Sequence, residues 1–123
     1  QGALVAEEMG LPFVYIRSEA KKHGLTNMIE GVVEKGQSVI IIEDLISTGG
    51  SSMKALDALR LAGCDVKGMA AIFTYGFKAA IDNFKKAKCK LFTLSDYETL
   101  VKQALKSNYI NEKNLKSLKA KCL

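Results

Sequence analysis

A continuous run of apolar residues at 38–43 (SVIIIE) constrains the fold more than any other feature of the sequence. Such a run, without polar alternation, is typical of a central strand of a parallel sheet that is buried on both faces. Strand-type and helix-type segments alternate around it, so we predict an α/β domain with a mostly parallel sheet, flanked by helices and joined by right-handed crossovers. The expected strands are residues 11–17, 38–43, 66–74 and 88–93, and the expected helices are residues 1–9, 53–62, 77–87, 95–106 and 112–121.

The length of 123 residues fits one domain. A domain of this size buries about two-thirds of the surface that its unfolded chain exposes, which is enough for a stable core. We therefore expect a single domain over residues 1–123, with residues 107–123 as a helical C-terminal extension. Because the helical pattern of residues 1–9 has no N-cap residue before it, we also expect the domain to be incomplete at its N-terminus.

Several classes of protein are excluded by the cysteines, the histidine and the hydropathy. Cys64, Cys89 and Cys122 are widely spaced and His23 is the only histidine, which argues against a zinc site or a disulfide framework. Cys64 and Cys89 are expected as small apolar residues near strands. No apolar run approaches the roughly 20 residues of a membrane span, and residues 1–10 lack the basic segment of a signal peptide. We expect a cytoplasmic protein without a membrane partner.

Positive charge is concentrated in the last third of the chain. Residues 1–77 contain 7 Lys and Arg against 9 Asp and Glu, whereas residues 78–123 contain 11 Lys against 4 Asp and Glu. One interpretation is a nucleic-acid-binding surface. The lysines are scattered over helix positions without an aromatic-rich strand, however, which favours a solvated helical surface. Nucleic acid is therefore not the expected partner.

A loop rich in glycine and hydroxyl groups (residues 43–52, EDLISTGGSS) follows the apolar strand, at the end of the sheet where ligands of such folds bind. Its N–H groups and those of the next helix can bind an anion, most naturally a phosphate monoester. Glu43 and Asp44 would repel that anion unless they bind sugar hydroxyls or help to hold Mg²⁺. The segment therefore predicts a site for a phosphorylated sugar. The alternative is an ordinary turn that caps a helix.

Residues 18–31 are polar and show no periodicity, so they predict a long loop. Arg17, Lys21, Lys22 and His23 place up to four positive groups within seven residues. Such a cluster could neutralise a pyrophosphate, and a basic loop of this kind can close over a substrate and exclude water. The alternative, favoured for Lys22, is a solvated surface loop.

These segments resemble the type I phosphoribosyltransferases. Residues 39–51 (VIIIEDLISTGGS) are similar to the phosphoribosyl-pyrophosphate motif of that family, and residues 15–31 (YIRSEAKKHGLTNMIEG) look most like orotate phosphoribosyltransferase. The resemblance, which covers roughly residues 1–106, implies transfer of 5-phosphoribose from phosphoribosyl pyrophosphate to orotate in pyrimidine biosynthesis. The implied products are orotidine 5′-monophosphate and pyrophosphate. It also implies Mg²⁺ held mainly by the substrate, and a homodimer whose loop reaches the neighbouring subunit.

The resemblance also implies roles for individual residues. Lys21, His23 and Asp44 would be catalytic, and Ser47 would lie near the orotate. Glu43 and Asp44 would hold the ribose hydroxyls. The full set implied in binding phosphoribosyl pyrophosphate is Arg17, Lys21, His23, Glu43, Asp44, Leu45, Ile46, Ser47, Thr48, Gly49, Gly50 and Ser51.

Three departures from the family pattern leave alternatives open. Ser18 stands where many relatives carry a second basic residue, and residues 74–77 (TYGF) lack the arginine that grips the orotate carboxylate in many of them. The family's N-terminal part is also absent, so the chain by itself is expected to be a partial enzyme. The alternatives are a purine or uracil acceptor, or a domain that senses phosphoribosyl pyrophosphate or a nucleotide without catalysis.

Overall fold

The computed structural model describes residues 1–18 and 28–120. Lys21, Lys22, His23 and Cys122 lie outside the described residues, so the roles expected for them stay predictions. Among the described residues, no helix is both long and apolar enough to cross a membrane.

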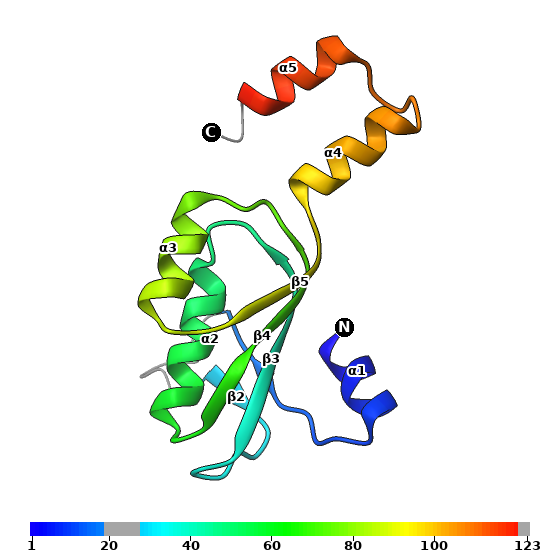
Figure 1. The fold of residues 1–123 in the computed structure, drawn as a ribbon. Coiled ribbons are helices and arrows are strands. Elements are labelled where there is room, and N and C mark those ends of the chain that lie inside the picture. The colour runs from blue at the N-terminus through cyan, green and yellow to red at the C-terminus, as the bar shows by residue number, and fades with distance from the viewer. Residues whose placement is uncertain (19–27, 121–123) are drawn as a thin grey trace.

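A three-stranded parallel sheet forms the centre of the structure (Figure 1). Its strands lie in the order β3 (Ser38–Ile46), β4 (Asp65–Thr74) and β5 (Leu91–Asp96). α2 (Gly50–Leu61) connects β3 to β4, and α3 (Lys78–Lys86) connects β4 to β5. The predicted α/β class with a mostly parallel sheet is confirmed, and all three strands end at the same edge.

The core lies between the sheet and the helices α2 and α3, which pack beside each other. Ile46, Leu56 and Met69 are fully buried there. Removing a side chain of this size from water contributes about 1.5–3 kcal/mol to the stability of the fold. Cys64 and Cys89 are buried in the same cluster as free thiols, which confirms the role expected for them.

The expectation that the strand at 38–43 is buried on both faces is wrong for the described residues. Ile40 is 62% exposed, and Ile72, Phe92 and Leu94 are exposed on the neighbouring strands. Two right-handed crossovers that run in the same direction across a sheet place both helices on one face. The second face is therefore left without a helical layer, although α1 (Gly2–Met9) contacts β3.

The strand expected at residues 11–17 is reduced to β1 (Tyr15–Ile16) and does not join the parallel sheet. It pairs antiparallel with β2 (Ile29–Glu30), which lies within the segment expected to be a loop. Pro12 cannot donate to a strand ladder, which shortens the first strand. Two residues are too few to produce a periodic pattern, which is why the second strand could not be recognised.

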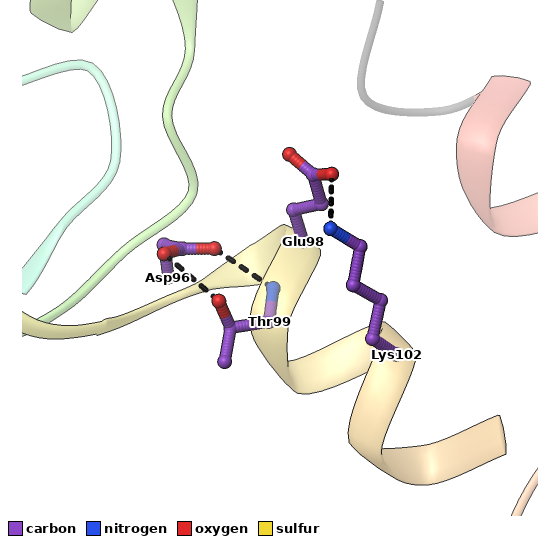
Figure 2. Close-up of polar contacts among 4 residues, drawn as sticks. All are labelled: Asp96, Glu98, Thr99 and Lys102. Atoms are coloured by element: carbon purple, nitrogen blue, oxygen red, sulfur yellow. Dashed lines mark hydrogen bonds and ion pairs between the residues drawn. The ribbon is translucent and has the colours of Figure 1, made fainter. Parts of the chain in front are cut away.

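Side-chain caps mark the start of the last two helices. For the first of them, the capping residue lies one position later than predicted. Figure 2 shows that α4 (Tyr97–Lys106) begins at Asp96, which accepts hydrogen bonds from the N–H (2.8 Å) and the hydroxyl (3.1 Å) of Thr99. The expected cap at residues 95–98 is therefore wrong by one position, and Glu98 pairs instead with Lys102 at 2.7 Å.

α5 (Glu112–Ala120) begins where the sequence predicts. The N–H of Asn114 donates to Asn111 Oδ1 at 3.0 Å, so Asn111 caps this helix as expected. Figure 1 shows α4 and α5 extending away from the sheet.

Candidate functional site

The glycine-rich loop lies at the carboxyl edge of the sheet, between the end of β3 and the start of α2. Ser47, Thr48, Gly50 and Ser51 are exposed there, so the loop is open to solvent. No side chain among the described residues accepts a hydrogen bond at the N-terminus of α2. The first N–H groups of a helix have no partner within the helix and carry partial positive charge. The loop is therefore available to an anion.

Gly49 gives the loop its shape. It is the N-cap of α2 and has a φ of +79°, a left-handed conformation that costs most residues about 1–2 kcal/mol. A Cβ atom at this position would also lie 3.3 Å from Cε2 of Phe84 on α3. Both the backbone angle and the packing thus require glycine here.

Hydrogen bonds from two other elements hold the loop in place. The side-chain amide of Asn83, on α3, donates to the carbonyl oxygen of Thr48 at 3.0 Å. On the β4 side, the N–H of Tyr75 donates to the carbonyl oxygen of Ile46 at 3.1 Å, and the hydroxyl of Thr74 donates to the same oxygen at 3.3 Å. Sequence reasoning missed Asn83 because nothing near it in the sequence marks a polar anchor.

The two acidic residues before the loop differ in their surroundings. They are consecutive on β3 but differ in exposure. Asp44 is exposed. Glu43 is half-buried, and its Oε1 accepts a hydrogen bond of 2.9 Å from the hydroxyl of Ser52 on α2. Ser52 is another site residue that sequence reasoning missed, although it directly follows the predicted loop.

Burial is the main cause that raises the pKa of Glu43 above its ordinary value of 4.5. The hydrogen bond from Ser52 lowers this pKa, and the negative charge of Asp44 raises it. The hydrogen bond therefore counteracts part of the cost of holding a carboxylate at this half-buried position.

Arg17, expected to bind pyrophosphate, lies at the end of β1 and forms an ion pair with Glu30. Its Nη1 is 2.8 Å from Glu30 Oε1. The backbone N–H of Arg17 donates to the carbonyl oxygen of Met28. Since Lys21 and His23 lie outside the described residues, the structure does not test whether these cations meet the glycine-rich loop.

An aromatic cluster stands beside the loop, where residues 74–77 lack an arginine. The ring of Tyr75 stacks on Phe77 at a centroid distance of 5.3 Å and meets Phe73 edge-on at 5.4 Å. Tyr97, at the start of α4, lies 5.8 Å away. The backbone hydrogen bond of Tyr75 to Ile46 places this cluster next to Ser47, a proximity that sequence reasoning did not predict.

A hollow on the surface lies apart from this site. A surface hollow of about 600 Å³ is lined by Leu105, Ile110, Leu115 and neighbouring residues, none of which belongs to the predicted site. No group of three or more His, Cys, Asp or Glu side chains in the described part of the chain could hold a metal ion.

Comparison with known proteins agrees with the resemblance inferred from the sequence. No family model matches the chain. The orotate phosphoribosyltransferase of Phocaeicola vulgatus is 60% identical over 115 residues, which are 94% of this chain and 54% of that protein. The chain thus spans about half the length of the curated relatives that it matches.

Solved structures share the fold. The Leishmania donovani UMP synthase matches with a TM-score of 0.78 and 26% identity, over 98% of this chain and 26% of that one. The orotate phosphoribosyltransferase of Aeropyrum pernix matches with a TM-score of 0.69 and 23% identity, over 82% and 55%. The fold is that of the type I phosphoribosyltransferases. Within that class, the curated relatives to which the sequence is similar are named orotate phosphoribosyltransferases.

Proposed function

We propose that this chain carries the phosphoribosyl-pyrophosphate site of an orotate phosphoribosyltransferase. The proposed reaction transfers 5-phosphoribose to orotate and releases pyrophosphate, giving orotidine 5′-monophosphate for pyrimidine biosynthesis. The observation that supports it most is the open N-terminus of α2, which has no side-chain cap and follows β3, the parallel strand that carries Glu43 and Asp44. The sequence similarity to orotate phosphoribosyltransferases supports the choice of acceptor.

The proposed roles follow from the charges that develop during the reaction. Displacement at the anomeric carbon creates positive charge on the sugar ring and negative charge on the departing pyrophosphate. In the proposed complex, residues 47–51 bind the 5′-phosphate through N–H and hydroxyl groups. Asp44 and Glu43 accept hydrogen bonds from the ribose hydroxyls and stabilise the positive ring. Leu45 and Ile46 contribute only the backbone that leads into the loop.

The cations of residues 17–23 would stabilise the leaving group. Lys21 and His23 are proposed to contact pyrophosphate when the loop covers the site, which also holds the reactants together and keeps water away. Arg17 can contribute to the same task only if pyrophosphate shares it with Glu30 or displaces that carboxylate, because the two side chains form an ion pair.

Magnesium is proposed to enter with the substrate. The proposed Mg²⁺ is bound mainly by phosphoribosyl pyrophosphate, because this ion is usually held through substrate phosphates and one or two carboxylates. Also proposed, from the sequence itself, are one domain with a helical extension at residues 107–123 and a cytoplasmic location. A homodimer with loop sharing is proposed from the resemblance alone.

Orotate consumption tests the proposal. A protein that carries this sequence at the full length of its relatives should deplete orotate absorbance only when phosphoribosyl pyrophosphate and Mg²⁺ are both present. Lys21→Ala should lower kcat by about a hundredfold or more, the loss typical of a group that stabilises developing charge. Lys116→Ala, which removes an exposed lysine on α5, serves as the matched control and should leave kcat unchanged.

Three results would redirect the assignment. Turnover with a purine or uracil but not with orotate would identify another phosphoribosyltransferase. Calorimetric binding of phosphoribosyl pyrophosphate without turnover on any base would identify a sensing domain. Salt-sensitive nucleic-acid binding by the lysine-rich C-terminal third, without phosphoribosyl-pyrophosphate binding, would replace the enzyme with a nucleic-acid-binding protein.

A further inference from the structure

We propose that Ser52 is a positioning residue that fixes the Glu43 carboxylate for the ribose hydroxyls of phosphoribosyl pyrophosphate. This inference rests on the proposed function and adds to it a residue outside the predicted binding set. Ser52 lies on α2, whereas Glu43 lies on β3, so the contact joins the helix to the strand across the start of the loop.

The geometry of the pair carries the inference. Ser52 is only 2% exposed and is the one buried polar residue among the described residues. Its hydroxyl donates to Glu43 Oε1 at 2.9 Å, a good distance for a hydrogen bond to a carboxylate. No buried side-chain N or O atom in the described part of the chain lacks a partner, so this bond satisfies the hydroxyl. Glu43 therefore keeps Oε2 for a further donor while its carboxyl group is held in one orientation.

Holding Glu43 has a consequence for binding. A long glutamate side chain that is already ordered loses less conformational freedom when a sugar hydroxyl binds to it. The hydrogen bond also favours the charged form of Glu43 against the effects of burial and of Asp44 on the same strand. On β4, the residue paired with Glu43 in the register is Ala71, which carries no charge. Ser52 is thus a neighbour that favours the charged form of this carboxylate and helps to align it.

Steady-state kinetics with variants of the full-length protein test the role. Ser52→Ala should raise KM for phosphoribosyl pyrophosphate about tenfold, at the lower end of what a hydrogen bond to a charged group contributes. KM for orotate should change less than about twofold, because the Ser52 hydroxyl is engaged by Glu43, the proposed ribose ligand. Ala55→Gly perturbs the same helix at another buried position, whose side chain cannot donate a hydrogen bond to Glu43, and should leave both KM values unchanged.

The double variant separates positioning from packing. If Ser52 acts through Glu43, adding Ser52→Ala to Glu43→Gln should raise KM for phosphoribosyl pyrophosphate by less than about twofold. A full tenfold increase in that background, an equal increase in Ala55→Gly, or no increase in Ser52→Ala alone would overturn the inference. Absence of turnover in the unmodified protein would instead overturn the proposed function. In that case the same cycle, measured on calorimetric binding of phosphoribosyl pyrophosphate, decides the role of Ser52.

Discussion

Replacing Gly49 by alanine should destabilise the protein by more than its backbone angle alone requires. At φ +79° a Cβ atom costs about 1–2 kcal/mol of unfolding free energy. The new methyl group would also lie 3.3 Å from the ring of Phe84, so the ring or the helix that carries it must shift. Overpacking of this kind adds about 1 kcal/mol or more. We therefore expect a total loss of roughly 2–3 kcal/mol for Gly49→Ala.

Gly36 provides a matched control because its φ is +82° and a Cβ atom there would meet nothing within 4 Å. Gly36→Ala should lose about 1–2 kcal/mol from the backbone alone. Urea unfolding of both variants measures the difference. Equal losses would refute the contribution of the Phe84 contact, and no loss in Gly36→Ala would refute the backbone argument. Adding Phe84→Leu should reduce the excess loss of Gly49→Ala by relieving the contact.

Three further predictions concern charges and anchors. The pKa of Glu43 is raised in the folded state, so the protonated form of Glu43 favours the fold. This stabilisation is present below pH 4.5 and is lost as the pH rises through the raised pKa of the folded state. Glu43→Gln should therefore flatten this part of the pH dependence of urea unfolding. Asn83→Ala should release the Thr48 carbonyl and raise KM for phosphoribosyl pyrophosphate about threefold to tenfold, with little effect on KM for orotate. The backbone N–H of Thr99 lowers the pKa of Asp96. The contribution of Asp96 to stability is therefore present above pH 3.8 and is lost as the pH falls through the lower pKa of the folded state. Asp96→Asn should remove this acid dependence of helicity, measured by circular dichroism.

The sequence was sufficient for the helices and for the strands of the parallel sheet, because local patterns carry that information. Apolar runs marked β3 and β4, and Gly10 and Asn111 marked helix ends that the structure contains. Gly10 ends α1 with a φ of +63°, the left-handed conformation for which glycine is preferred at this position. These features depend on neighbouring residues alone, which is why they could be predicted.

The missed features depend on contacts between segments that are distant in the sequence. The pairing of β1 with β2 joins residues on either side of a segment that has no pattern of its own. Asn83 reaches Thr48 across 35 positions, and the ring of Tyr75 meets Tyr97 at the start of another helix. Even Ser52, nine residues from Glu43, becomes a partner only because α2 folds back onto the strand.

The acidic pair shows how the fold refines a motif. The sequence assigns the same role to Glu43 and Asp44, but the structure gives the two side chains different exposure. Asp44 is exposed and free to adjust to a bound sugar, whereas Glu43 is half-buried and held by Ser52. In the proposed complex, the aligned carboxylate of Glu43 would orient the ring, and the adaptable carboxylate of Asp44 would follow the charge that develops on it. Loss of Glu43 should therefore affect substrate binding more than the chemical step, and loss of Asp44 should affect the chemical step more.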